Sequence, residues 1–360
     1  MVREALRRAT VEESMVDEVI MGNAIAAGLG QNPARQAAIY AGIPVGVGSF
    51  TLNKVCGSGL KAVMLAAQAV KAGDAGIVVA GGMESMSNAP HLVKELRWGT
   101  KYGDVHLVDG MIHDGLWDAY NEFHMGMTGE RVAEKFGVTR KEADEFAYES
   151  NMKAAAASQG GFDQEIVPVR VQREQGEVNV FRTDECVRPD TTLEKLAALR
   201  PVFKSNGILT AGNSSQLSDG AAAVVVASSE KASSLGLKPV ARIASYASGG
   251  MRPEDVMEAP IPVVKSLLEK TGMTVGDMDL FEHNEAYSTA SIVVRRELGV
   301  DPERFNVNGG AVALGHPIGC SGARVLTTLL HSLNQRGKKR GLATLCIGGG
   351  NAVAMIVEML

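Results

Sequence analysis

Three short segments of this chain carry side chains that could form and break a covalent bond to sulfur. Cys56 lies in the sequence Asn-Lys-Val-Cys-Gly-Ser-Gly, His316 lies between a glycine and a proline, and Cys346 is followed by three glycines after Ile347. A thiolate is a strong nucleophile, and an imidazole can draw off its proton. Glycine-rich turns expose backbone N–H donors that can hold a developing oxyanion. Together these residue types indicate acyl transfer through a cysteine.

Cys56 is expected at the N-terminus of a helix, because an apolar stretch begins at Leu60. The positive end of a helix dipole and the unpaired N–H groups there predict a lowered thiol pKa. Gly57 and Gly59 allow a sharp turn and a close approach of substrate to the backbone. The alternative interpretation is that Cys56 is a small buried apolar side chain.

The other two segments also have a structural interpretation. His316, pinned between Gly315 and Pro317, presents its imidazole rigidly and is a candidate general base, although a loop histidine with satisfied hydrogen bonds fits the same pattern. Cys346 could supply a second thiol, or could simply end a buried strand before a turn. The combination of the three segments favours chemistry over packing.

An internal repeat predicts the elements that position these residues. Ser58 follows Asp17 by 41 positions, and Ser321 follows Asp279 by 42. Each serine opens an apolar helical stretch, and a strand-like run that ends in glycines follows each stretch. Such self-similarity predicts two similar α/β halves, with the chemistry gathered where their turns meet.

The same repeat indicates that the first half lacks a strand. In the second half a strand-like segment, 240–246, precedes a helix that begins near Val263, and alignment of the two repeats places Val263 on Met1. The first half is therefore expected to lack its first strand, a segment of about twenty residues. We expect this loss to leave a central position of its sheet unfilled.

The composition excludes several classes of protein. A chain of 360 residues with 45% hydrophobic content can bury a large core and exceeds one typical domain. The net charge of −5 gives little electrostatic support for nucleic-acid binding, and no apolar run approaches the ~18 residues of a membrane span. Neither a CxxC pair nor an HExxH motif occurs, so no metal site is expected. Four cysteines without a secretory signal predict a reducing, cytoplasmic location.

The segments around Cys56, His316 and Cys346, together with His-Asn-Glu-Ala at 283–286, strongly resemble the thiolase family. The resemblance covers the chain from Met1 to Leu360 and includes four further motifs, at Gly30–Gln36, Gly82–Ser87, His124–Gly126 and Ala211–Ser215. It implies an α/β fold with a thiolase-like duplicated βαβ core. Two similar halves, each with a mixed five-stranded sheet, would have helices between them and an inserted loop domain. Family members also carry a strand upstream of the position of Met1, in agreement with the gap in the repeat.

The resemblance also implies domain boundaries. The N-terminal half would comprise residues 1–85 and 217–238, and the C-terminal half residues 239–360. Residues 86–216 would form the loop domain that covers coenzyme A. Thiolases bind no resident cofactor, and coenzyme A is their substrate and product.

Catalytic roles follow from the resemblance. Cys56 would be the nucleophile that takes up an acyl group, and His316 would accept its proton. Cys346 would act as acid and base at the second substrate. Asn284 would hold a water molecule that, with His316, stabilises an enolate-like oxygen. The backbone N–H groups of Cys56 and Gly348 would hold the thioester oxyanion, where loss of one donor typically costs ~10²–10³ in rate.

Substrate-binding roles are implied in the same way. His124 and Met125 would line the pantetheine tunnel, and Ser215 would contact the pantetheine amide region. Met125 and Met257 would flank the acyl pocket and favour short chains. Arg188 would lie near the nucleotide, where a guanidinium suits phosphate or adenine, although by itself it could be a solvated surface charge.

The implied reaction is the reversible condensation of two acetyl-CoA molecules to acetoacetyl-CoA, and three alternatives remain open. A 3-ketoacyl-CoA thiolase of wider chain range is favoured by Gln216, while Tyr287 and His283 depart from the commoner family motif. A β-ketoacyl synthase shares the fold but generally has histidine or asparagine where Cys346 stands. A truncated, non-catalytic acyl-CoA-binding subunit is the third alternative. Cys320 is expected to pack, and a homodimer or homotetramer is expected from the family.

Overall fold

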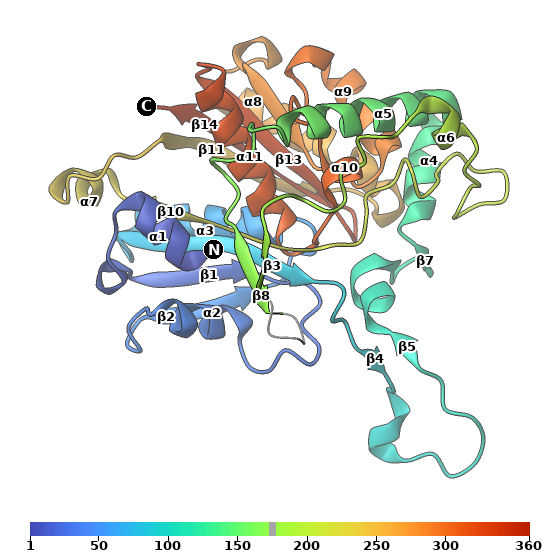
Figure 1. The fold of residues 1–360 in the computed structure, drawn as a ribbon, viewed down its shortest axis with the longest axis horizontal. Coiled ribbons are helices and arrows are strands. Elements are labelled where there is room, and N and C mark those ends of the chain that lie inside the picture. The colour runs from blue at the N-terminus through green and yellow to red at the C-terminus, as the bar shows by residue number, and fades with distance from the viewer. Residues whose placement is uncertain (173–177) are drawn as a thin grey trace.

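The computed structural model describes residues 1–172 and 178–360 and places two four-stranded sheets at its centre (Figure 1). The first sheet has the order β10-β3-β1-β2 and the second the order β11-β14-β13-β12. The strands of the first sheet are β1 (Glu18–Gly22), β2 (Gly48–Leu52), β3 (Ile77–Ser85) and β10 (Asp219–Ala227). Those of the second are β11 (Ala241–Gly250), β12 (Leu280–His283), β13 (Arg340–Ile347) and β14 (Asn351–Met359).

The two sheets share one pattern of pairing. β1 pairs in parallel with β3, and β12 with β13. β3 in turn pairs antiparallel with β10, and β13 with β14. The repeat is visible in single side chains as well. Asp17 accepts hydrogen bonds from the N–H groups of Gly76 and Ile77, and Asp279 accepts them from Lys339 and Arg340. The duplicated α/β fold predicted from the repeat is confirmed.

The strand count differs from the prediction of five strands in each half. In the second half the fifth position is only a single parallel bridge between Phe281 and Phe305, beside β12. In the first half β2 fills that position, but no described residues pair with the outer side of β10, whereas its counterpart β14 is covered by β11. The prediction that a central position would be unfilled is wrong. β11 is an edge strand, so the position without a strand beside β10 lies at the edge of the first sheet.

Two helices lie between the sheets and form the central layer. They are α3 (Ser58–Ala72) and α11 (Ser321–Gln335). Their apolar side chains pack with one face of each sheet in a single core cluster, which includes Leu60 and Leu329 from the helices and Ile20 and Met355 from the sheets. Because side chains alternate along a strand, Val19 and Met21 face the opposite side of the first sheet from Ile20.

The outer faces of the sheets are covered by the remaining helices of the two halves. α1 (Val2–Ala9) and α2 (Pro33–Ala41) cover the first sheet, and α8 (Pro260–Thr271) and α9 (Ser288–Leu298) cover the second. The resulting order is helix, sheet, helix, sheet, helix (Figure 1). Shorter elements complete the halves: η1 (Glu13–Met15), α7 (Ser229–Ser234), η4 (Pro253–Glu258), η5 (Val275–Asp277), η6 (Pro302–Arg304) and α10 (Ala311–Leu314).

α3 and α11 cross where each has a glycine in its first turn. A Cβ on Gly59 would lie 2.6 Å from the backbone nitrogen of Ala323, and one on Gly322 would lie 2.3 Å from that of Leu60. Backbone atoms cannot move aside as a flexible side chain can, so neither position accepts a larger residue. The crossing therefore brings the N-termini of the two helices, which follow Cys56 and Cys320, close together.

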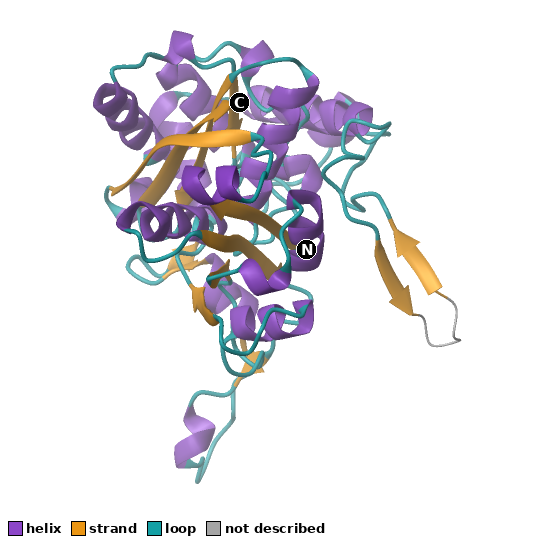
Figure 2. Ribbon diagram, turned by 90° about the vertical axis from the view of Figure 1, so that its left-hand side faces the viewer, coloured by secondary structure: helices purple, strands orange, loops and turns teal. Residues whose placement is uncertain are grey.

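The segment between β3 and β10 leaves the two-sheet core. Its helices α4 (Gly126–Phe136), α5 (Arg140–Ala157) and α6 (Leu193–Ala197) lie beside the second half, and two extensions project from the body (Figure 2). One carries β4 (His91–Leu92), η2 (Glu95–Trp98) and β5 (Val108–Asp109), and the other carries β8 (Val169–Gln172) and β9 (Val178–Phe181). The pair β6 (Trp117–Asp118) and β7 (Phe123–His124), with η3 (Ile112–Leu116), leads into α4. Among the described helices, none is both long and apolar enough to cross a bilayer.

Candidate active site

Cys56 lies in a tightly held turn between β2 and α3. The Ser58 hydroxyl accepts a hydrogen bond from the Lys54 N–H at 2.8 Å and donates to the Val55 carbonyl at 2.7 Å. The Asn53 side chain accepts from the Val55 N–H at 2.8 Å. Val55 has a positive φ of 45°, an uncommon conformation for a β-branched residue. These local hydrogen bonds hold the strained turn and with it the position of the sulfur.

The electrostatics of Cys56 differ from the expectation. Burial raises the pKa of its thiol to about 11, while the N–H groups of Gly348 and of Cys56 itself lower it and the Glu84 carboxylate raises it further. The prediction of a lowered pKa is therefore wrong. Removing water from around the sulfur destabilises the thiolate more than the nearby N–H dipoles stabilise it.

His316 is neutral and held in one tautomer. Its Nδ1 lies 2.5 Å from the Ser321 hydroxyl, which itself donates to the Pro317 carbonyl at 2.9 Å. With the hydroxyl proton donated to the carbonyl, Nδ1 carries the hydrogen and the lone pair is on Nε2, within reach of the Asn284 amide. Burial, with a smaller contribution from Arg324, lowers the pKa of His316 to about 3. The imidazole is thereby presented as a proton acceptor.

Asn284 lies on the Nε2 side of the imidazole. Its Nδ2 is 3.3 Å from Nε2 of His316, and its own Oδ1 is buried with no hydrogen-bond partner among the described residues. A buried amide oxygen without a partner is a place where a water molecule or a substrate group can bind. This geometry suits the predicted role of holding a water molecule beside His316.

Cys346 is the last residue but one of β13. It is almost fully buried, and its sulfur lies 3.8 Å from the sulfur of Met257. Burial and the proximity of Cys56 raise the pKa of the Cys346 thiol far above its ordinary value. If ionised during a reaction, this sulfur would be an unusually strong base.

The two sulfurs and the imidazole share one narrow cavity of about 40 Å³. Seven of the predicted site residues line it: Cys56, Met125, Ser215, Met257, His316, Cys346 and Gly348. The seven come from both halves and from the segment between them, so the cavity forms where these parts meet. Its small volume leaves room for a short acyl group.

Three of the predicted residues do not line this cavity: Asn284, which contacts His316, together with His124 and Arg188. His124 stacks on Phe203 with ring centroids 4.8 Å apart, and its Nδ1 accepts a hydrogen bond from the Gly126 N–H. Arg188 is exposed and donates to the Gln216 side chain at 3.3 Å. Their predicted contacts with pantetheine and nucleotide lie farther out than the reacting groups and stay predictions.

Several functional neighbours were not found from the sequence. Ser321 orients His316, and Tyr287, Ile318 and Ala286 line the cavity without carrying a recognisable signal. Tyr287 was noted only as a departure from the family motif. Its phenol is buried, and burial raises its pKa. Residues 315–320, between α10 and α11, form the loop that carries His316 (the His316 loop). The cavity residues come together because this loop packs against the segment that follows β12, and no local sequence pattern predicts such a contact.

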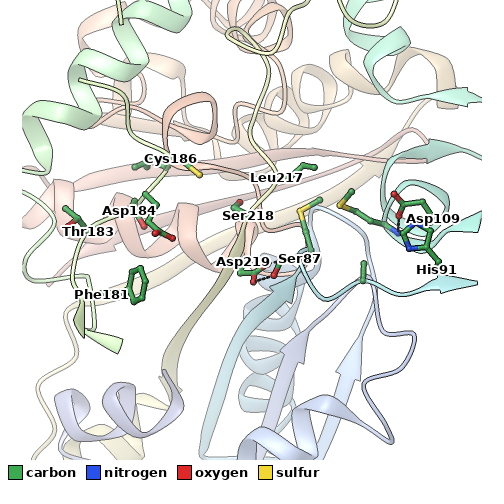
Figure 3. A pocket seen from close by; sticks show the side chains of 15 residues that line it. Ser87, His91, Asp109, Phe181, Thr183, Asp184, Cys186, Leu217, Ser218 and Asp219 are labelled. Carbon is green, nitrogen blue, oxygen red and sulfur yellow. Dashed lines mark hydrogen bonds between the residues drawn. The ribbon is translucent and has the colours of Figure 1, made fainter. Parts of the chain in front are cut away.

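A second, larger cavity of about 740 Å³ lies between the residues that follow β3 and those that follow β9 (Figure 3). Its lining includes the carboxylates of Asp109, Asp184, Glu185 and Asp219, and the described residues that line it include no lysine or arginine. Ser87 is hydrogen-bonded to Asp219 there. Such an acidic lining does not suit the phosphates of coenzyme A, and none of the predicted site residues lines this cavity, so the smaller cavity is the candidate site despite its size.

Comparison with known proteins assigns the class. The family model described as "Thiolase, N-terminal domain" matches residues 1–230, and the one described as "Thiolase, C-terminal domain" matches residues 237–359. This chain belongs to the thiolase family, as its motifs indicated. Two similar proteins are the acetyl-CoA acetyltransferases of Pseudomonas aeruginosa and Cupriavidus necator. They are 55% and 54% identical to this chain over 98% and 99% of its length, and over 90% and 91% of their own.

The solved structures show the same relationship. The acetyl-CoA acetyltransferase of Bacillus anthracis superposes with a TM-score of 0.97 at 42% identity, covering 100% of this chain and 91% of that one. A likeness of this extent confirms the thiolase fold for the whole chain.

Proposed function

We propose that this protein is an acetyl-CoA C-acetyltransferase that joins two acetyl-CoA molecules to give acetoacetyl-CoA and free coenzyme A, and that it also catalyses the reverse cleavage. One observation carries the proposal: two thiols and a neutral imidazole, from different halves of the fold, face one small cavity. The names of the similar proteins support the same activity.

In the first half-reaction Cys56 takes the acetyl group. His316 Nε2 accepts the thiol proton as the sulfur attacks the thioester carbonyl, and the N–H groups of Cys56 and Gly348 hold the oxyanion. The bond to the coenzyme A sulfur then breaks, and Cys346 gives its proton to the leaving thiolate. Acetyl-Cys56, free coenzyme A, a Cys346 thiolate and a protonated His316 result.

In the second half-reaction a new carbon–carbon bond forms. The Cys346 thiolate removes a proton from the methyl group of a second acetyl-CoA, and Asn284 and His316 stabilise the enolate oxygen, Asn284 through a water molecule. The enolate carbon attacks acetyl-Cys56, and the Cys56 sulfur leaves and recovers its proton from His316. The raised pKa of Cys346 suits this step, because a methyl proton is weakly acidic and needs a strong base.

The cavity supports a short acyl chain over a long one. Met125 and Met257 both line it, and both are buried. The Gln216 side chain, whose presence favoured a wider chain range, donates to the Cys186 carbonyl at 2.9 Å and accepts from Arg188. Because it turns away from the acyl cavity, it does not favour the 3-ketoacyl-CoA alternative. A non-catalytic subunit is disfavoured by the convergence of all the reactive groups.

The test is acyl-enzyme formation and turnover with Cys56→Ser. The parent is expected to gain one acetyl group from acetyl-CoA by intact-protein mass spectrometry, and to cleave acetoacetyl-CoA when free coenzyme A is added. Cys56→Ser should form no adduct and lose ~10⁴-fold or more in kcat, as loss of a nucleophile does elsewhere.

The matched control is Cys186→Ser, at a half-buried thiol outside the cavity, which should still acylate. Persistence of the adduct on Cys56→Ser would refute the nucleophile. A folded parent that binds acetyl-CoA without turnover would instead favour a binding subunit.

We also propose a homodimer or homotetramer in the cytoplasm. Support comes from apolar side chains exposed on the β4–β5 extension, namely Leu96, Trp98, Tyr102 and Leu107, and from the open edge of β2. Light scattering on the purified protein measures the mass directly, and a monomer at micromolar concentration would contradict the proposal.

A further inference from the structure

Glu84 is a buried carboxylate near the end of β3 that the reaction above does not use. It is 4% exposed, and each of its oxygens accepts two hydrogen bonds. Oε1 accepts from the Asn23 side chain at 2.8 Å and from the Ile25 N–H at 3.2 Å. Oε2 accepts from the Ala24 N–H at 3.0 Å and from the Gly319 N–H at 2.8 Å.

All four groups around this carboxylate are donors. A protonated carboxyl would have to donate from one oxygen, and no acceptor faces either oxygen in these contacts. The side chain is therefore ionised and held by N–H dipoles instead of by a cation. Burial raises its pKa, and the hydrogen bonds oppose that rise.

The four donors belong to different halves of the molecule. Asn23, Ala24 and Ile25 follow β1 of the first half, whereas Gly319 belongs to the His316 loop of the second half. Glu84 thus joins the loop of the general base to the strand ends of the half that carries the nucleophile.

A second side chain extends this link to the nucleophile. The Asn53 amide donates to the Ala24 carbonyl at 3.2 Å and accepts from the Val55 N–H at 2.8 Å. A continuous series of hydrogen bonds therefore runs from Gly319 through Glu84, Ala24 and Asn53 to Val55, the residue before Cys56.

The contact between the two halves is close at this point. A Cβ on Gly319 would lie 2.7 Å from the Asn23 Cα and from the Met83 carbonyl oxygen, and one on Gly82 would lie 2.1 Å from the Gly319 carbonyl oxygen. The His316 loop therefore rests on the strand ends of the first half with no side chain in between. A shift of one half against the other would move His316 relative to Cys56 directly.

We propose that Glu84 is a positioning residue that holds the His316 loop in register with the Cys56 turn, and so sets the distance over which the thiol proton is transferred. The inference rests on the proposed function for the reaction that it serves. A displacement of reacting groups by about 1 Å can cost ~10² in rate, and this link connects the two loops whose relative position matters.

The geometry specifies why glutamate is needed. Glutamine keeps the size but replaces one acceptor oxygen by an NH₂ group, which would face N–H donors. Aspartate keeps the charge but is shorter by one C–C bond, about 1.5 Å, and cannot reach both sets of donors. Glu84→Gln removes the charge and Glu84→Asp removes the length. A loss of activity in both variants therefore points to the hydrogen-bonded link, and not to the charge or the volume of the side chain alone.

The experiment compares Glu84→Gln and Glu84→Asp with matched changes at Glu130. Glu130 is 3% exposed and accepts from the Ile208 and Leu209 N–H groups, away from both catalytic loops. For the Glu84 variants kcat for acetoacetyl-CoA cleavage should fall ~10²-fold, while KM stays within about threefold, because substrate binding does not use the link. The Glu130 variants should lose stability without this selective loss of kcat.

A double-mutant cycle with Asn53→Ala provides an independent readout. Asn53 is exposed, so its replacement should leave the protein folded. If both residues act through one link, the effects of Asn53→Ala and Glu84→Asp on kcat should be strongly non-additive. Additive effects, or Glu84 variants with kcat within about threefold of the parent, would overturn the proposal.

The rate at which iodoacetamide alkylates Cys56, followed by peptide mass mapping, separates this proposal from the proposed function. Glu84→Asp keeps the local charge, so slower alkylation in that variant reports the lost proton acceptor. If the parent turns over and the Glu84 variants match it, only the positioning role fails. If the parent does not turn over, the proposed function is wrong. In that case an alkylation rate of Glu84→Asp equal to that of the parent would show that the positioning role is wrong as well.

Discussion

Cys56 and His316 are both held in their neutral forms by burial. The pKa of the thiol is about 11 and that of the imidazole about 3, so the two side chains do not form an ion pair. In the proposed reaction the sulfur loses its proton as negative charge passes to the thioester oxygen, which the N–H groups of Cys56 and Gly348 would hold.

Replacement of Met125, which lines the cavity, tests whether this side chain limits the length of the acyl chain. Met125→Ala should raise kcat/KM for a 3-ketoacyl-CoA two methylenes longer by ~10-fold relative to acetoacetyl-CoA, since one methylene in a pocket is worth about 10–200-fold. The control is Met64→Ala, a buried methionine in the core between the sheets, which should lower stability and leave the ratio unchanged. An unchanged ratio for Met125→Ala would place the acyl chain elsewhere.

At the scale of elements, the crossing of α3 and α11 brings the two active turns together. Both helices begin at the crossing, and each has glycine where the partner backbone approaches. Because the helices belong to different halves, their separation sets the separation of the nucleophile and the base. The same crossing explains why small residues occupy the first turn of both helices.

Gly59→Ala tests the crossing. Alanine improves helix propensity by ~1 kcal/mol, but its Cβ would lie 2.6 Å from the Ala323 nitrogen and 3.0 Å from the Cys320 oxygen. Overpacking of this kind costs about 1–3 kcal/mol, so the clash should win and the free energy of unfolding in urea should fall. Gly46→Ala, with no atom within 4 Å of its Cβ, should be neutral or slightly stabilising. Equal stability of Gly59→Ala and the parent would mean that the helices can separate freely.

At the scale of the whole molecule, burial of titratable groups between the halves shapes the dependence of stability on pH. His283 and His316 have their pKa values lowered from 6.5 to about 3, chiefly by burial. Burial likewise raises the pKa of Glu282 from 4.5 to about 8 and that of Glu165 to about 7. The unfolded chain binds more protons than the folded one at the histidines below pH 6.5, and fewer at the glutamates above pH 4.5.

These opposing groups predict a stability maximum in urea between pH 4.5 and 6.5, where their effects nearly cancel. Below that window the histidine contributions are lost with a slope of about 1.4 kcal/mol per pH unit for each group, and above it the glutamate contributions are lost. His283→Val should remove roughly half of the acid slope, whereas replacement of the exposed His106 should not change it. An acid slope identical to that of the parent would show that His283 is protonated in the folded protein.

Much of the fold followed from short-range pattern. The repeat of Asp17 and Asp279 predicted two equivalent sheets, and the apolar stretches that begin near Leu60 and Ser321 are helices, as expected. The reactive segments were also recognisable, because glycines and a proline next to a cysteine or histidine specify a turn locally. Patterns of this kind depend only on neighbours in the chain.

The errors concern properties that depend on distant packing. The position without a strand lies at the edge beside β10 and not at the centre, because strand order is set by crossovers between elements. The pKa of Cys56 is raised and not lowered, because the cavity that buries it is closed by Met125, Met257 and Tyr287 from other segments. Glu84 was visible only as part of a family motif, and its link to Gly319 spans 235 positions.

By itself, the sequence determined which residues can react, which turns present them and that the chain consists of two similar halves. Only the tertiary structure decided how far apart those turns lie, how dry the space between them is and which carboxylate joins them. The physical reason is that turn and helix preferences act over a few residues, whereas desolvation and hydrogen bonds between Cys56, His316 and Glu84 exist only after the halves have packed.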